Sequence, residues 1–184
     1  MSWPIGVLAA LIGVLGFNPV SVELPVSGSE ETHCVVRVVD QNDDGQFVFD
    51  SPTCFDQLPA ALVFASDGLI TEQELADVSG PALFAAPDEA GALASFTLGI
   101  HFDGSNGTGN SISVVGSSCT GGWWNTGGTW ANRISSSWNG CYRLRHYDSP
   151  NKVGTWADTT GVGQTDNLAS FMNNRTESVA YYGS

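Results

Sequence analysis

Two short stretches of the chain repeat a pattern of oxygen-bearing side chains. Asn132-Arg133-Ile134-Ser135-Ser136 reappears 42 positions later as Asn174-Arg175-Thr176-Glu177-Ser178. Amide, hydroxyl, carboxylate and backbone carbonyl oxygens are the ligands that Ca²⁺ prefers in proteins. The pattern therefore marks a candidate calcium site. The alternative is that Asn and Ser only hydrogen-bond the backbone of their own loops.

A second match lies upstream of each of these stretches. Ile100-His101-Phe102-Asp103 reappears 45 positions later as Arg145-His146-Tyr147-Asp148, and a glycine follows seven residues after the aromatic in both copies, at Gly109 and Gly154. An aromatic ring that covers a hairpin turn, with glycine supplying backbone freedom, is typical of this spacing. Two matches in the same order predict two like units that pack about a pseudo-twofold axis around one core.

The elements that position these residues are predicted to be β-strands. Phe96, Leu98, Ile100 and Phe102 alternate with smaller or polar residues, which indicates a strand with one buried face. Residues 96–184 are rich in Gly, Ser, Thr and Asn, a composition that suits short strands joined by tight turns. No helical stretch of any length is expected there, so we predict an all-β fold.

On these residues and motifs, the second half of the chain resembles the βγ-crystallin superfamily. The aromatic with a glycine seven residues later matches the hairpin pattern of that family, although Gly107 and Lys152 stand where another aromatic is usual. Residues 131–136 and 173–178 resemble the calcium-binding stretch of its microbial members. The domain is also similar to actinobacterial metalloproteinase inhibitors and small antimicrobial toxins. The resemblance implies two Greek-key motifs that form one sandwich.

The resemblance also implies how calcium binds. Each site takes the fifth-position side chain of one loop, Ser135 or Glu177, with backbone carbonyls near Arg133 or Arg175, and the other loop completes the site. Besides Asn132 and Asn174, the first-position Asn173 belongs to the expected ligand set, whereas Ala131, its counterpart, supplies no donor. We therefore expect one usable and one defective site, with dissociation constants of about 10⁻⁴–10⁻³ M.

A tryptophan pair, Trp123-Trp124, lies in a glycine-rich stretch just inside the segment from Cys119 to Cys141. Tryptophan is enriched in binding hot spots, so the pair is a candidate surface for a protein partner. The alternative is a bulged strand in which Trp123 points inward and Trp124 outward.

Catalysis has little support in the sequence. The three histidines, His33, His101 and His146, are scattered, and the last two occupy matching positions of the repeat, which favours a structural role. The chain has no G-x-S-x-G elbow, no H-E-x-x-H helix and no phosphate-binding glycine loop. We therefore expect a protein that is not an enzyme.

The four cysteines fall into two local pairs. Their spacing shows no C-x-x-C zinc motif, and an even number favours disulfides. Of the three possible pairings we prefer Cys34 with Cys54 and Cys119 with Cys141. Each bridge then closes a loop that stabilises the fold by roughly 3 kcal/mol in the loop-entropy model.

Charge is distributed unevenly along the chain. Residues 1–94 contain fourteen Asp and Glu and a single base, Arg37, whereas residues 96–184 contain five acids and five bases. Nucleic-acid binding requires clustered Lys and Arg, so nucleic acid is not expected as a partner.

The first residues resemble an export signal. Ile5 to Phe17 is an uncharged apolar run that is shorter than the roughly 20 residues of a membrane-spanning helix, so we predict a signal peptide over 1–28 and no stable membrane span. The paired cysteines independently favour an extracellular location.

Residues 29–95 form an acidic segment, either a small cap or a pro-segment. Two β-branched or apolar runs, 33–39 and 47–49, flank Asn42-Asp43-Asp44-Gly45 and predict a hairpin bracketed by Cys34 and Cys54. The turn looks like half of an EF-hand loop but lacks the closing glutamate. Thr71 with Glu74 resembles a capping box that opens a short helix through Val78.

These observations together predict a bacterial secreted, monomeric, non-enzymatic βγ-crystallin-like domain over 96–184. The resemblance implies an extracellular binding protein, with a metalloprotease inhibitor that binds calcium weakly as the preferred function. A toxin against competing microbes and a structural calcium-binding envelope protein are the alternatives.

Overall fold

The fold is described from a computed structural model that covers residues 31–71, 73, 75 and 97–183. The predicted signal peptide lies outside the described residues. The predicted short helix lies only partly within them: Gln73 and Leu75 are helical, and the Leu75 N–H donates to the carbonyl of Thr71.

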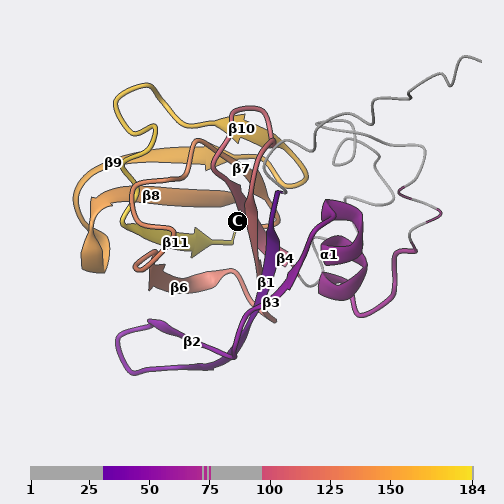
Figure 1. The fold of residues 1–184 in the computed structure, drawn as a ribbon. Coiled ribbons are helices and arrows are strands. Elements are labelled where there is room, and N and C mark those ends of the chain that lie inside the picture. Colours follow the sequence, from indigo (N-terminus) through magenta and orange to yellow (C-terminus); the bar gives the residue numbers. More distant parts are fainter. Residues whose placement is uncertain (1–30, 72, 74, 76–96, 184) are drawn as a thin grey trace, which may run out of the picture.

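The described chain consists mainly of β-strands in two sheets, which confirms the all-β prediction (Figure 1). A seven-stranded sheet has the order β10-β7-β4-β5-β1-β2, with β3 also paired to β1, and a four-stranded sheet has the order β6-β11-β8-β9. The elements are β1 (His33–Gln41), β2 (Phe47–Phe49), β3 (Thr53–Phe55), α1 (Leu58–Ala65), β4 (Thr97–Phe102), β5 (Ser111–Val115), β6 (Thr120–Asn125), β7 (Ser136–Asn139), β8 (Arg143–Ser149), η2 (Pro150–Lys152), β9 (Val153–Thr160), β10 (Thr165–Asn167) and β11 (Ser178–Tyr182).

The strand order shows two equivalent units. Strands β4 to β7 and strands β8 to β11 each place their first, second and fourth strands in one sheet and their third strand in the other. Thus β6 pairs with β11, and β10 pairs with β7. Because each sheet contains a strand of the other unit, the two units share one core.

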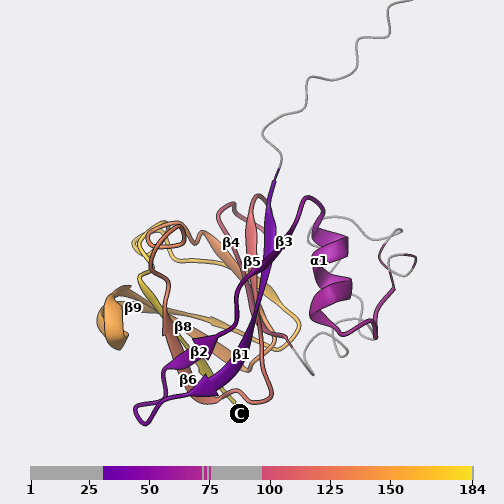
Figure 2. The same ribbon diagram turned by 60° about the horizontal axis from the view of Figure 1, so that its bottom comes forward.

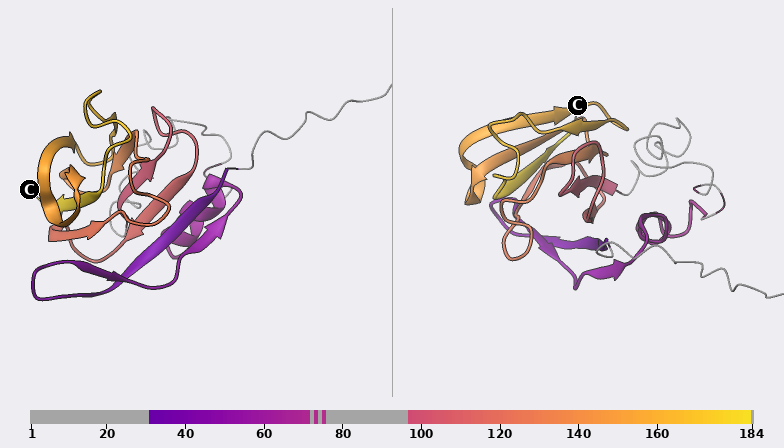
Figure 3. Two further views of the ribbon diagram at one scale, coloured as in Figure 1. Left: turned by 60° about the vertical axis from the view of Figure 1, so that its left-hand side comes forward. Right: turned by 45° about the horizontal axis from the view of Figure 1, so that its top comes forward.

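Strand β4 is buried on both faces, which differs from the single buried face that the alternation predicts. A bulge between Thr97 and Gly99 directs Ile100 and Phe102 to the outer face, where they pack in one cluster with Leu62 of α1. Figures 1 and 3 show α1 on the side of the seven-stranded sheet that faces away from the four-stranded one. The helix therefore adds a third layer on this side.

The N-terminal segment continues the larger sheet. Strand β1 pairs in parallel with β5, from His33 opposite Ser111 to Arg37 opposite Val115, and pairs antiparallel with β2 in the predicted hairpin. Figure 2 shows the hairpin crossing to β6 of the other sheet. There the ring of Phe47 packs against Tyr181 at 5.5 Å. The larger sheet therefore contains strands from both sides of the expected domain boundary near residue 95.

Both predicted disulfides are present. Cys34 and Cys54 are directly opposite each other on β1 and β3, and Cys119 and Cys141 join the start of β6 to the turn between β7 and β8. In the described part of the chain, no helix has the length and apolar character needed to cross a membrane.

The contact of Phe47 with the central core generates a stability prediction. Phe47→Ala removes a buried ring between the sheets and is expected to lower the free energy of unfolding by about 3–5 kcal/mol. Val39→Ala, an exposed position of the same hairpin, is the control and should change it by less than about 0.5 kcal/mol. Urea unfolding of both variants measures the difference. Equal effects would show that the hairpin is not part of the core.

Candidate functional site

The two oxygen-rich loops lie against each other. The Asn132 N–H donates to the carbonyl of Thr176 at 2.9 Å, and the Asn174 N–H donates to the carbonyl of Ile134 at 3.0 Å. The two bonds are equivalent by the repeat. The structure therefore brings residues 131–136 and 173–178 together at one place.

Side chains cross between the loops in the same symmetric way. The Ser135 hydroxyl donates to Oδ1 of Asn174 at 3.0 Å, and Nδ2 of Asn132 donates to Oε1 of Glu177 at 3.0 Å. The fifth-position side chain of each loop thus contacts the second-position side chain of the other. This is the cross-loop arrangement on which the predicted calcium sites depend.

The backbone explains why asparagine occupies the second position. Asn132 and Asn174 have φ angles of 58° and 56°, in the left-handed region that asparagine tolerates better than most residues. Each asparagine therefore turns its loop and also presents an amide to the opposite loop.

The arginine side chains point away from the crossing and anchor each loop to its own unit. Arg133 donates from Nη2 to Oδ2 of Asp103 at 2.5 Å and from Nη1 to the carbonyl of Thr129 at 3.1 Å. In the second unit Arg175 lies 3.5 Å from Asp148 and donates to the carbonyl of Phe171. Only the backbone carbonyls of the arginines are thus suited to hold a cation.

The two aspartates also account for the glycines of the repeat. Gly109 and Gly154 have positive φ angles, and a Cβ at either position would collide with the carboxylate of Asp103 or Asp148. The expected partner of each glycine was the preceding aromatic ring, but the side chain that closes on it is the aspartate. Both copies carry this aspartate directly after the aromatic, and that match in the repeat was the available signal.

The remaining predicted ligands contribute little. Asn173 is exposed, and its side chain makes no hydrogen bond within the described part of the chain; Ala131 has no polar side-chain atom. Among the described residues, no group of three or more His, Cys, Asp and Glu side chains is placed to hold a metal. Any cation here depends on neutral oxygens and on Glu177.

The tryptophan pair is buried. Trp123 is 3% exposed and donates from Nε1 to the carbonyl of Asp44, whereas Trp124 is 7% exposed and donates to the Tyr181 hydroxyl. Neither ring is exposed enough to form the expected partner-binding surface, and Trp124 points into the core rather than outward. The hairpin β1–β2, which was expected to belong to a separate segment, covers Trp123.

The repeat-related histidines meet in the centre of the core. The rings of His101 and His146 are 5.5 Å apart, and both side chains are fully buried. His101 bonds Ser137 and Tyr181 at 2.8 Å, whereas Nδ1 of His146 has no hydrogen-bond partner among the described residues. Burial lowers the pKa of His146 to about 3 and holds the pKa of His101 well below its ordinary value, so both are neutral.

No protein-family model, curated protein or solved structure matches the chain.

The neutral histidines predict a loss of stability in mild acid. Above pH 6.5 neither state binds these protons, but below it the unfolded chain does and the folded chain does not. The free energy of unfolding should therefore fall by roughly 4 kcal/mol between pH 7 and 5, with both histidines contributing. Urea unfolding at these pH values tests this. His146→Gln should remove about half of the pH dependence, and an unchanged slope would contradict the assignment.

Proposed function

We propose that residues 97–182 form a βγ-crystallin-like pair of Greek keys that binds calcium weakly outside the cell. The strand order supports this, because each four-strand unit gives its third strand to the other sheet. The two disulfides support an oxidising extracellular location.

One observation carries the calcium proposal, namely the pair of symmetric contacts between the loops. Two neighbouring oxygens bound to one Ca²⁺ at 2.3–2.6 Å lie about 3 Å apart. Ser135 Oγ and Asn174 Oδ1 are 3.0 Å apart, so the observed geometry fits two ligands of one ion. The other pair, Asn132 and Glu177, also fits once the amide turns its oxygen to the ion.

The two sites differ in strength. The site with Ser135 offers only neutral oxygens, those of Ser135, of Asn174 and of backbone carbonyls. The site with Glu177 has a carboxylate, the stronger ligand for a hard cation, but faces Ala131. One usable and one defective site are therefore expected, with dissociation constants of about 10⁻⁴–10⁻³ M, as in extracellular modules.

Calorimetric titration of the full chain with CaCl₂ tests the proposal. Binding in the range of about 10⁻⁴–10⁻³ M is expected. A calcium concentration ten times the dissociation constant should stabilise the fold by about 1.4 kcal/mol, seen as a rise in the melting temperature. Glu177→Ala should weaken one site about tenfold or more, because it removes the only carboxylate of the crossing.

Asp43→Asn is the matched control, since it also removes one carboxylate but lies in the exposed turn between β1 and β2. It should leave calcium binding unchanged. No heat and no thermal shift with calcium, or equal losses in Asp43→Asn and Glu177→Ala, would overturn the proposal.

The partner class follows only from the resemblance. As an inhibitor, the chain should form a stoichiometric complex with a secreted metalloprotease and slow its hydrolysis of a peptide substrate. Size-exclusion chromatography and activity assays over a panel of such proteases measure this. If no member of the panel is bound or slowed, the inhibitor function is wrong while calcium binding stands.

A further inference from the structure

Strand β9 forms an open edge of the four-stranded sheet. In the order β6-β11-β8-β9 it pairs with β8 alone, and among the described strands none lies along its other side. Residues 153–156 of the strand are exposed. Backbone N–H and C=O groups along such an edge form a template on which another strand can pair.

The hydrogen bonds of β9 show which backbone groups face the open edge. The Thr160 N–H donates to Oδ2 of Asp166 rather than to β8, so it points away from β8. In an antiparallel pair this direction alternates from one residue to the next, and the register is regular from 156 to 160. The N–H and C=O of Trp156 and Asp158 therefore also point away from β8. Within the described part of the chain, no strand meets these groups.

In the first unit the equivalent edge is already occupied. Strand β5 corresponds to β9 by the offset of 45, since Ser111 lies opposite Phe102 as Trp156 lies opposite Tyr147. Strand β1 runs parallel along this edge of β5, and the Ser111 N–H donates to the carbonyl of Thr32 at 3.0 Å. The Trp156 N–H thus faces the position on β9 that β1 takes on β5.

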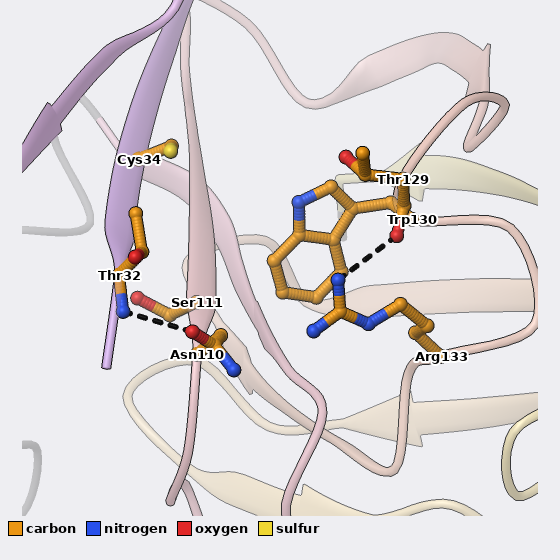
Figure 4. A pocket seen from close by; sticks show the side chains of 7 residues that line it. All are labelled: Thr32, Cys34, Asn110, Ser111, Thr129, Trp130 and Arg133. Atoms are coloured by element: carbon orange, nitrogen blue, oxygen red, sulfur yellow. Dashed lines mark hydrogen bonds between the residues drawn. The ribbon is translucent and has the colours of Figure 1, made fainter. Parts of the chain in front are cut away.

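The start of β1 shows how the added strand is held at its end. Figure 4 shows this end beside a pocket, where the Thr32 N–H donates to Oδ1 of Asn110 at 2.8 Å. By the offset of 45, Thr155 is the counterpart of Asn110. It is exposed and has a hydroxyl that can accept the same kind of bond. The edge of β9 therefore provides the backbone groups and an acceptor equivalent to those that hold β1.

The side chains of β9 leave its edge unprotected. Edge strands are commonly protected by unpaired charges or by proline. The one charged residue of β9 is Asp158, and both of its carboxylate oxygens accept hydrogen bonds from Arg145. The same guanidinium lies 3.6 Å from the ring of Trp156, so binding is assigned to the backbone of β9 and not to this ring. A charged partner would find no free counter-charge on the strand, which favours an uncharged one.

We propose that the edge of β9 binds an extended, uncharged segment of a partner protein, which runs parallel to β9 as β1 runs along β5. The residue in the position of Cys34 donates its N–H to the carbonyl of Trp156 and accepts the N–H of Asp158. Its side chain lies beside Ala157, the counterpart of Ile112, and this small neighbour leaves room for a β-branched residue. The proposal depends neither on calcium nor on a protease, because these contacts do not involve the crossing of the loops.

The test is an NMR titration of the isotope-labelled full chain with a capped peptide of residues 32–36 that carries Cys34→Thr. This segment pairs with the equivalent edge in the first unit, and its side chains are uncharged at pH 7. A roughly millimolar dissociation constant is expected, because the peptide forms only a few backbone hydrogen bonds. The amide signals of Trp156 and Asp158 should shift more than that of Ala157, whose N–H faces β8.

Two N-methylated forms of the peptide are the matched controls. Methylation of the backbone nitrogen in the position of Cys34 removes the bond to the Trp156 carbonyl and should weaken binding about tenfold or more. Methylation in the position of Val35, whose N–H points away from the edge, should leave binding unchanged.

Three results would overturn the proposal. The first is a titration that leaves the amide signals of Trp156 and Asp158 unchanged, and the second is equal binding of the two methylated peptides. The third is a shift of these signals with protein concentration in the absence of peptide, which would make a second copy of the chain the occupant of the edge.

Discussion

The exchange of third strands between the two units is the constraint on which the rest of the structure depends. After β6 the chain must leave the four-stranded sheet to form β7 in the other, and after β10 it must return to form β11. The two connections, 126–135 and 168–177, therefore cross between the two sheets in opposite directions. They meet at Asn132 and Asn174, where each N–H bonds the opposite loop. The candidate calcium site exists because of this crossing.

The same exchange explains the polar centre of the core. His101 and His146 occupy equivalent positions on β4 and β8, the first strands of the two units, and face each other across the sandwich at 5.5 Å. Tyr181 satisfies one of them and accepts the indole N–H of Trp124. Hydrogen bonding of this kind offsets the cost of burying neutral polar groups and fixes how the two sheets face each other.

Departures from symmetry come from the N-terminal segment. Strand β1 extends only the sheet that contains β5, and α1 covers only the outer face of that sheet. The outer face of the four-stranded sheet carries Arg145, which forms a bidentate ion pair with Asp158 and stacks on Trp156 at 3.6 Å. Interaction with the Asp158 carboxylate raises the pKa of Arg145. The two faces of one duplicated scaffold thus present different chemistry.

Local pattern was sufficient to predict strands at 33–39, 47–49 and 96–102, the β1–β2 hairpin, both disulfides and the two related units. These features depend on alternation, turn chemistry and short sequence separation, which one sequence displays directly. It was not sufficient for the parallel pairing of β1 with β5, because 78 positions separate His33 from its partner Ser111 and no local signal specifies that contact. The burial of Trp123 followed from the same long-range contact, since the hairpin covers it.

The side-chain contacts between repeated positions could be predicted only in part, because the sequence shows which positions correspond but not which of them meet. Asn106 and Asn167 exchange two hydrogen bonds, and Asn151 and Asn125, their counterparts by the repeat, also exchange two. Their spacing follows the two offsets already visible in the sequence. However, Asn106 and Asn151 lie after the first strand of one unit and contact the end of the third strand of the other. Predicting this contact requires the sheet order, which an offset alone does not supply.

Arg133 ties the crossing of the loops to the rest of the first unit. Its backbone belongs to the loop that crosses residues 173–178, and its side chain bonds Asp103 and the Thr129 carbonyl. Arg175 makes the equivalent bonds at longer distances and with a more exposed side chain. Charge-assisted hydrogen bonds are stronger when short and shielded, so the first loop is the more tightly anchored of the two. The unit that gained the N-terminal strand therefore also holds its calcium-candidate loop more tightly than the second unit does.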